Sequence, residues 1–152
     1  MRLKDKVILV TASTRGIGLA IVKKCAEEGA EVYMAARDME RAREIASTLT
    51  GVKCVYNDAT KPETFASMVE DVVQDAGRID VLVNNAGVQN NKNALDYSAE
   101  EFSALFDTNV IGKTFAVLCD DDYNEALFCY GKTIFATCTE SYKKAIESVD
   151  FA

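Results

Sequence analysis

Short runs of consecutive apolar residues alternate along this chain with stretches in which apolar residues recur every three or four positions. The short runs are typical of strands that are buried on both faces, and the longer stretches are typical of helices. Their alternation predicts βαβ units and therefore a parallel sheet. We expect five parallel strands, at residues 6–11, 31–36, 52–56, 79–83 and 132–137.

Helical periodicity is clearest between the third and fourth expected strands, where apolar residues within 65–76 keep the i, i+3, i+4 spacing without a break. A second helix is expected over residues 99 to about 118, and it follows Ser98 and Glu101 at the spacing of a capping box. Residues 120–130, by contrast, show neither a clear period nor a turn signature. A parallel sheet with helices on both faces binds ligands at the carboxyl ends of its strands, so chemistry is expected there.

The chain has 152 residues, and we expect residues 1–152 to form a single domain in which residues 120–152 are a divergent C-terminal segment. Hydrophobic residues make up 49% and there is one proline, which excludes a disordered protein. The formal net charge of −7 argues against nucleic acid and anionic membrane as partners. The apolar run at residues 7–10 is too short for a signal peptide or a membrane span, so a cytoplasmic location is expected.

The chain contains five cysteines and no histidine. The cysteines are odd in number and include no C-x-x-C pair, so buried free thiols are their expected state. The lack of histidine excludes histidine-based catalysis and histidine-ligated metal sites, and we expect no metal site.

A glycine-containing turn, Thr11-Ala12-Ser13-Thr14-Arg15-Gly16-Ile17-Gly18, follows the first expected strand and opens a helix. The inner face of that helix is expected to carry Ile17, Ile21 and Cys25. The N-terminus of a helix offers free N–H groups and a partial positive charge, and it binds a phosphate where glycines allow a close approach. This context favours a dinucleotide phosphate site over an ordinary strand-to-helix turn.

The second expected strand ends in Ala35-Ala36-Arg37-Asp38. An NAD-binding fold usually has an acid here that holds the ribose hydroxyls. The guanidinium groups of Arg37 and Arg15 would instead bracket a 2′-phosphate, which favours NADP(H) over NAD(H). Two alternatives stay open, since Arg37 can be a solvated surface cation and Asp38 can still serve NAD(H).

Two further polar sites follow expected strands. Asn84-Asn85-Ala86-Gly87 comes after the fourth strand, and we expect cofactor contact from it, with a plain loop as the alternative. Asp58 comes after the third strand. Its carboxylate could accept a hydrogen bond from the adenine amino group, and a helix-cap role is the alternative.

Asn109 lies on a helical stripe that is otherwise apolar. The other members of the stripe are Phe102, Leu105, Phe106 and Val110. A buried amide needs hydrogen-bond partners. Asn109 therefore either stitches the core together, which the pattern favours, or holds a water or a backbone group at an active site.

Together these motifs resemble the short-chain dehydrogenase/reductase family, which carries T-G-x-x-x-G-I-G, an N-N-A-G after the fourth strand and a helical asparagine. The motifs occur in the family's order between Leu3 and Gly112, with Ala12 in place of the first glycine. The resemblance implies a Rossmann-type, doubly wound α/β sheet of about five strands that is incomplete at its C-terminal end. It also implies hydride transfer between NADP(H) and a small-molecule alcohol or ketone.

The resemblance implies a role for each matching residue. The pyrophosphate would be cradled by Thr11, Ser13, Thr14, Arg15, Gly16, Ile17 and Gly18, the 2′-phosphate held by Arg15 and Arg37, adenine flanked by Asp58 and Ala59, and the ribose lined by Asn85, Ala86 and Gly87. Asn109 would be the family's water-holding asparagine. Family members also use a serine that orients the carbonyl, a tyrosine as acid and base, and a lysine four residues after the tyrosine.

The chain departs from the family pattern after Asn109. Cys138 stands where the catalytic serine is expected, Phe151 stands near the place of the tyrosine, and the sequence contains no Tyr-x-x-x-Lys. We therefore expect an NADP(H)-binding protein with impaired turnover. The alternatives are an active oxidoreductase, seen as a fragment or completed by a partner, and a non-catalytic scaffold or regulatory protein.

The C-terminal part of the sequence also bears on association. A sheet that stops at the fifth strand would expose an edge, and residues 142–149 carry an apolar helical stripe that needs a surface to cover. We therefore expect the chain to form a homo-oligomer or to be marginally stable.

Overall fold

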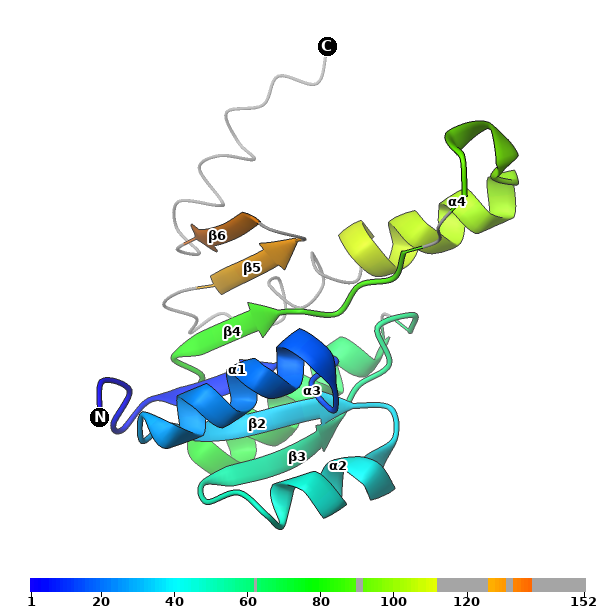
Figure 1. Ribbon diagram of the computed structural model, residues 1–152. Helices are drawn as coiled ribbons and strands as arrows, with labels where there is room; N and C mark the ends of the chain where they lie inside the picture. Colours follow the sequence, from blue (N-terminus) through cyan, green and yellow to red (C-terminus); the bar gives the residue numbers. More distant parts are fainter. Residues whose placement is uncertain (62, 90–91, 112–125, 131–132, 138–152) are drawn as a thin grey trace.

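The computed structural model describes residues 1–61, 63–89, 92–111, 126–130 and 133–137. These residues form a six-stranded sheet with helices on both faces (Figure 1). The strands are β1 (Val7–Val10), β2 (Glu31–Ala36), β3 (Val52–Tyr56), β4 (Val81–Asn84), β5 (Ala126–Tyr130) and β6 (Thr133–Thr137). The helices are α1 (Gly16–Glu27), α2 (Met39–Ala46), α3 (Glu63–Ala76) and α4 (Ala99–Phe106), with a 3₁₀ turn at Ala94–Asp96 and a π-helical stretch at Asp107–Ile111.

The strand order is β3-β2-β1-β4-β5-β6, and each neighbouring pair from β3 to β5 runs parallel. After β1 the chain adds β2 and β3 on one side of β1, and it then crosses to the other side of β1 to add β4, β5 and β6. The fold is therefore the Rossmann-type, doubly wound α/β sheet that the sequence predicted. The order reverses between β1 and β4, and in such sheets the ligand site lies beside this reversal.

The expected position of the fifth parallel strand was wrong. β5 (Ala126–Tyr130) is the strand parallel to β4, while β6 (Thr133–Thr137) pairs antiparallel with β5. Only residues 131 and 132 separate these strands in the sequence, which is far too short for the crossover that a parallel pair needs. The run Ala-Leu-Phe-Cys-Tyr at β5 is apolar and aromatic enough to have been recognised as a strand.

The two faces of the sheet bury separate apolar clusters because successive side chains of a strand point to opposite faces. Leu9 of β1 packs with Phe65 and Met68 of α3 on one face. Val10 of β1 packs with Val22 of α1 and Ala42 of α2 on the other. Figure 1 shows the same division, with α1 and α2 in front of the sheet and α3 behind it.

The helices agree with the sequence patterns in part. The expected apolar periodicity of residues 65–76 is confirmed, since α3 covers it and buries Phe65, Met68, Val69 and Val72. The capping box is also confirmed, because Ser98 Oγ accepts from the N–H of Glu101 (3.2 Å) and the Ser98 N–H donates to the Glu101 carboxylate (3.1 Å).

Two expected helix faces differ from the structure. Of the expected inner face of α1, Ile21 and Cys25 are partly buried against the core, but Ile17 is 64% exposed, because the helix turns Gly18 and Val22 toward the sheet. In α4, Phe102 is 63% exposed, and Phe106 and Val110 are also exposed among the described residues. An apolar stripe shows which side of a helix is apolar, but the neighbouring elements decide whether that side is covered.

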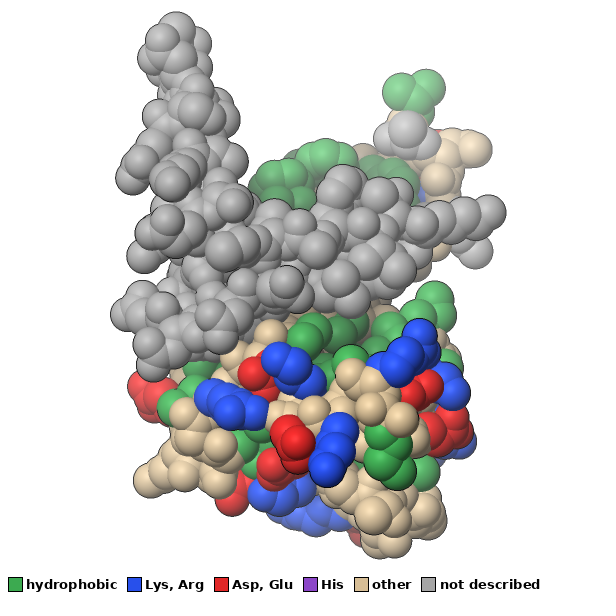
Figure 2. Space-filling view, turned by 90° about the vertical axis from the view of Figure 1, so that its left-hand side faces the viewer, with side chains coloured by type: hydrophobic (Ala, Val, Ile, Leu, Met, Phe, Trp, Pro, Cys, Tyr) green, Lys and Arg blue, Asp and Glu red, His purple; other side chains and the backbone are tan. Residues whose placement is uncertain are grey.

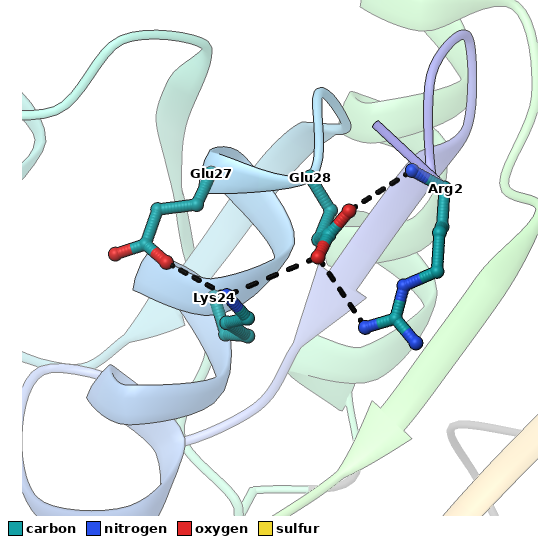
Figure 3. Close-up of polar contacts among 4 residues, drawn as sticks. All are labelled: Arg2, Lys24, Glu27 and Glu28. Carbon is teal, nitrogen blue, oxygen red and sulfur yellow. Dashed lines mark hydrogen bonds and ion pairs between the residues drawn. The ribbon is translucent and has the colours of Figure 1, made fainter.

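Ion pairs at the C-terminal end of α1 anchor the start of the chain (Figure 3). Glu28 accepts from the backbone N–H of Arg2 (3.0 Å) and from its guanidinium (3.3 Å), and Lys24 lies 3.0 Å from Glu27. The hydrogen bond from the Arg2 backbone is the main reason that the pKa of Glu28 lies below its usual value. Leu3 also donates to the Glu28 carbonyl, so the N-terminal segment is held beside the helix end.

A second polar cluster lies at the β3 edge of the sheet. Lys53 Nζ lies 2.6 Å from Asp75 and 2.7 Å from Glu31, and the Tyr33 hydroxyl donates to Asp75 (2.5 Å). The hydrogen bonds from Lys53 and Tyr33 lower the pKa of Asp75. The pKa of Lys53 is raised, first by its hydrogen bond with Asp75. The cluster thus ties β2, β3 and α3 together through charged groups.

We expect Asp75→Asn to lower the melting temperature at pH 7 and to have little effect in acid. Because folding lowers the pKa of Asp75, its contribution to stability is present above the unfolded pKa of about 3.9 and is lost as the pH falls through the folded value. Melting curves between neutral pH and about pH 2.5 test this. Asp71→Asn is the control, because Asp71 lies on the same helix and lines the same surface pocket as Lys53 and Asp75 but is not one of the residues of this polar cluster. A deficit that stays constant over this pH range contradicts the expectation.

Several expectations concern residues outside those that the structure describes. They are Cys138, Phe151, the apolar stripe at residues 142–149, and the part of the expected helix beyond residue 111. Among the helices that are described, none is both long enough and apolar enough to cross a bilayer.

Candidate functional site

A cavity of about 430 Å³ lies where the first four strands end. Its walls come from the segments after β1, β2, β3 and β4 and from the π-helical stretch after α4. The lining residues are Ala12, Thr14, Arg15, Ala36, Arg37, Asp38, Arg41, Asn57, Asp58, Ala59, Thr60, Ala86, Gly87, Val88 and Thr108. The cavity therefore occupies the carboxyl edge of the parallel sheet, where the sequence placed the chemistry.

Three arginines line the cavity at this edge of the sheet. Arg15, Arg37 and Arg41 all line the cavity, against the carboxylates of Asp38 and Asp58. Figure 2 shows the other end of the sheet, where the strands begin, and there blue basic and red acidic side chains are interspersed among the described residues. The cavity is thus a locally cationic site on a chain whose net charge is −7.

The turn after β1 is held close to the start of α1. A Cβ on Gly18 would lie 2.5 Å from Asn85 Nδ2 and 2.8 Å from the Ala12 carbonyl oxygen, so no larger residue fits there. Gly16 has φ +55°, a left-handed conformation that favours glycine. Ala12 adopts φ 50° without being glycine, at the position where the family motif has its first glycine.

The N-terminus of α1 is open to an anion. Arg15 is the N-cap residue and, within the described part of the chain, gives no side-chain hydrogen bond to the first turn. The first amides of a helix need partners, and the aligned peptide dipoles favour a negative group there. Since Thr14 and Arg15 also line the cavity, a phosphate in it would lie beside these amides.

Thr11 and Ser13 were expected to touch the cofactor, but the structure places both behind the cavity wall. Ser13 is fully buried, and its hydroxyl donates to the Val10 carbonyl (2.9 Å). The Thr11 hydroxyl accepts from the backbone N–H groups of Asn85 and Ala86, each at 3.0 Å. Both side chains therefore position the turns that form the cavity. Neither residue is among the described residues that line the cavity.

The turn after β4 is tied to the turn after β1. Asn85 Nδ2 donates to the carbonyl oxygens of Thr11 (3.0 Å) and Ala12 (3.1 Å), so this amide holds the backbone of the glycine turn in place. Ala86 and Gly87, the next two residues, line the cavity. Gly16, Ile17, Gly18, Asn85 and Asn109 are not among the residues that line it in the described structure.

Asp58 is expected to stay ionised in the cavity. Its carboxylate accepts from the Thr60 N–H (3.1 Å) and hydroxyl (2.8 Å). Burial alone would raise its pKa, but the hydrogen bonds from Thr60 and the nearby charges of Arg37 and Lys61 hold the pKa below its usual value. The two hydrogen bonds also fix the direction in which the carboxylate faces.

Asn109 clamps the loop after β4. Its Oδ1 accepts from the Val88 N–H (2.9 Å), and its Nδ2 donates to the Val88 carbonyl (2.8 Å). Both ends of the side chain therefore bind the backbone of Val88, a residue that lines the cavity, so Asn109 holds a backbone group beside the candidate site and is not part of either core cluster of the described residues. A Cβ at Gly87 would lie 3.1 Å from Asn109 Oδ1, so this loop passes close to the clamp.

Several cavity residues escaped the sequence reasoning. Arg41, Asn57, Thr60, Val88 and Thr108 line the cavity, although no motif named them. Arg41 had a usable signal, because it follows the expected strand end by only a few residues and lies in the first turn of a helix. The others carry no comparable signal, since polar and small residues after a strand are common in any turn.

Comparison of this sequence with known protein families identifies the class to which this fold and cavity belong. The family model described as short chain dehydrogenase matches residues 6–118. The chain belongs to the short-chain dehydrogenase family, whose members are oxidoreductases that use nicotinamide cofactors.

Two curated relatives are hydroxysteroid dehydrogenases. The 7α-hydroxysteroid dehydrogenase of Clostridium sardiniense is 47% identical over 116 residues, which cover 72% of this chain and 44% of the relative. The 3α-hydroxysteroid dehydrogenase of Mediterraneibacter gnavus is 37% identical over 119 residues, covering 72% of this chain and 46% of the relative. The chain thus spans less than half the length of these relatives.

Solved structures agree with the assignment. A short chain dehydrogenase from Mycobacterium smegmatis matches with a TM-score of 0.74 and 31% identity, over 78% of this chain and 51% of that one. A putative short-chain alcohol dehydrogenase from Sinorhizobium meliloti matches with a TM-score of 0.72 and 30% identity, over 77% and 48%.

Proposed function

We propose that this chain binds NADP(H) in the cavity at the carboxyl ends of its strands and serves as the coenzyme-binding part of an oxidoreductase. The observation that carries the proposal is the meeting of Arg15 and Arg37 in that cavity, beside the open N-terminus of α1. A pyrophosphate fits the helix N-terminus, and a 2′-phosphate fits the guanidinium groups.

Different residues of the cavity would bind different parts of the coenzyme. Thr14, Arg15 and the first turn of α1 would hold the pyrophosphate, and Arg15 with Arg37 would hold the 2′-phosphate. Asp58 and Ala59 would flank adenine, while Ala86 and Gly87 would line the ribose. Thr11, Ser13 and Asn85 would act as positioning residues, because their polar atoms hold the backbone that forms the site.

The reaction we propose is hydride transfer between the coenzyme and a secondary alcohol or ketone, for which the bound nicotinamide supplies the hydride acceptor or donor. The hydroxysteroid dehydrogenases among the relatives support a hydroxysteroid as the substrate class. This sequence has Cys138 in place of the expected serine and no Tyr-x-x-x-Lys. We therefore propose that these residues alone turn over substrate poorly and that Asn109 acts by positioning the Val88 backbone at the cavity.

Association and location complete the proposal. We propose that the chain forms a homo-oligomer in the cytoplasm and that its partners are small molecules rather than nucleic acid or membrane. The exposure of Phe102, Phe106 and Val110 on one side of the α4 segment supports association.

We expect NADPH to bind at least about tenfold tighter than NADH, a difference of about 1.4 kcal/mol, because two guanidinium groups face the extra phosphate. Titration of the purified chain with each coenzyme, followed by nicotinamide fluorescence, measures both affinities. Arg37→Ala should remove most of the preference by weakening NADPH binding and leaving NADH binding nearly unchanged.

Lys23→Ala serves as the control for this experiment, since Lys23 is an exposed cation on α1 that does not line the cavity. Equal affinities of the unaltered chain for the two coenzymes would contradict the NADP(H) assignment. Absence of binding for both would contradict the proposed function as a whole.

A further inference from the structure

The first turn of α2 places a third arginine in the coenzyme cavity. Arg41 is the third residue of α2, it is exposed, and it lines the same cavity as Arg15 and Arg37. Arg37 directly follows β2 and Arg41 lies in the first turn of α2, so both come from the same junction. Two arginines of this junction therefore line the cavity, and Arg15, the residue before α1, lines it as well.

The acidic residue at this junction, Asp38, caps the start of α2. Asp38 is the N-cap residue of α2, and its Oδ1 accepts from the backbone N–H of Arg41 (3.0 Å). An N-cap carboxylate satisfies an otherwise unpaired helix amide, and its loss costs about 1 kcal/mol of helix stability. The cap fixes Oδ1 of Asp38 on the start of α2, so the observed bond supports a capping role over the NAD(H)-type role that the sequence left open for Asp38.

The second acid of the cavity is also engaged. Asp58 accepts two hydrogen bonds from Thr60, and both fix its carboxylate at the β3 side. Three arginines therefore face two carboxylates that already have partners. Guanidinium groups at this wall fit a phosphate dianion better than they fit a pair of neutral ribose hydroxyls.

We propose that Arg41 is a specificity-determining residue that binds the 2′-phosphate of NADP(H) together with Arg37, while Asp38 works as a helix cap and takes no part in ribose recognition. The inference rests on the proposed coenzyme site and goes beyond it, because Arg15 and Arg37 alone would already account for a preference. It assigns part of that preference to a residue outside the glycine turn and the strand end.

Arg41→Ala tests the assignment against a matched neighbour. Arg43 lies two residues further along α2 and lines a separate hollow beside Lys53 and Asp75, so Arg43→Ala removes the same charge from the same helix on another side. We expect Arg41→Ala to weaken NADPH binding about fivefold to tenfold, the loss of roughly one exposed charge-assisted contact, and to leave NADH binding within about twofold. Arg43→Ala should change neither affinity by more than about twofold.

Two additions make the result decisive. Competition with 2′,5′-ADP and with 5′-AMP isolates the phosphate, and Arg41→Ala should weaken only the former. Asp38→Asn keeps a good N-cap and removes the charge, so it should leave NADH binding unchanged if Asp38 does not hold the ribose. Melting curves for each variant show whether the fold is intact.

Each outcome has one meaning. If the unaltered chain prefers NADPH and Arg37→Ala lowers that preference but Arg41→Ala does not, the role of Arg41 is overturned and the proposed function stands. If Asp38→Asn weakens NADH binding, the cap-only role of Asp38 is overturned. If the unaltered chain binds neither coenzyme, or binds both equally, the proposed site fails and the role of Arg41 fails with it.

Discussion

Replacing Gly18 with alanine is expected to destabilise the fold by about 3 kcal/mol and to abolish coenzyme binding. The added Cβ would lie 2.8 Å from both the Ala12 carbonyl oxygen and the Ser13 Cα. Both are backbone atoms, and they lie in a turn that Asn85 braces through the Thr11 and Ala12 carbonyls. The turn can relieve the overlap only by moving away from α1, which would open the phosphate site and break these hydrogen bonds.

Gly16→Ala provides the matched control for this variant. A Cβ on Gly16 would meet no other atom within 4 Å, so its cost comes only from the left-handed φ of +55° and should be about 1 kcal/mol. Urea unfolding curves give the free energy of unfolding for both variants. Equal losses for Gly18→Ala and Gly16→Ala would show that the close approach of the turn to α1 does not hold the site together.

Thr11→Val is expected to lower the free energy of unfolding by about 2 kcal/mol, because it leaves buried backbone donors without their acceptor. Valine has nearly the shape of threonine, so the packing of this buried residue is kept while its hydroxyl is lost. The Ala86 N–H then loses its bond to the hydroxyl, and the Asn85 N–H keeps only the Val83 carbonyl. The turn that carries Ala86 and Gly87 into the cavity should loosen, and coenzyme affinity should fall with it.

Thr11→Ser separates the hydroxyl from the methyl group. Serine keeps the acceptor and loses one buried methyl, so we expect a loss of about 1 kcal/mol with coenzyme binding retained. Urea unfolding and coenzyme titration of the two variants provide the comparison. If the Thr11→Val variant binds coenzyme as tightly as the Thr11→Ser variant, the hydroxyl at position 11 does not organise the site.

The sequence predicted most of the central fold. The strands at β2 and β3 have the bounds that their apolar runs indicated, and α3 covers the predicted periodic stretch. The error at the far edge arose because residues 120–130 show neither a clear period nor a turn signature, and no strand was therefore predicted there. A short buried strand has no period, and β6 takes its antiparallel direction from the two-residue connection rather than from its own composition.

The candidate site divides in the same way. The sequence motifs and the family resemblance predicted seven residues that line the cavity, namely Thr14, Arg15, Arg37, Asp58, Ala59, Ala86 and Gly87. Thr11, Ser13 and Asn85 come from the same motifs but support the wall from behind. Adjacent positions in a tight turn point in different directions, so membership of a motif does not show which atoms face a ligand.

By itself, the sequence determined the order of the first four strands, the glycine turn that opens α1, and the presence of arginines just after strands. These features depend on residues that are close together in the chain, and backbone propensity and apolar period record them locally. Only the tertiary structure decided that Arg41 shares the cavity with Arg37 and that Asp38 caps a helix. It alone also showed that the hydroxyl of Thr11 holds a turn more than seventy residues away. These contacts join segments that are distant in sequence or depend on side-chain direction, which no local pattern encodes.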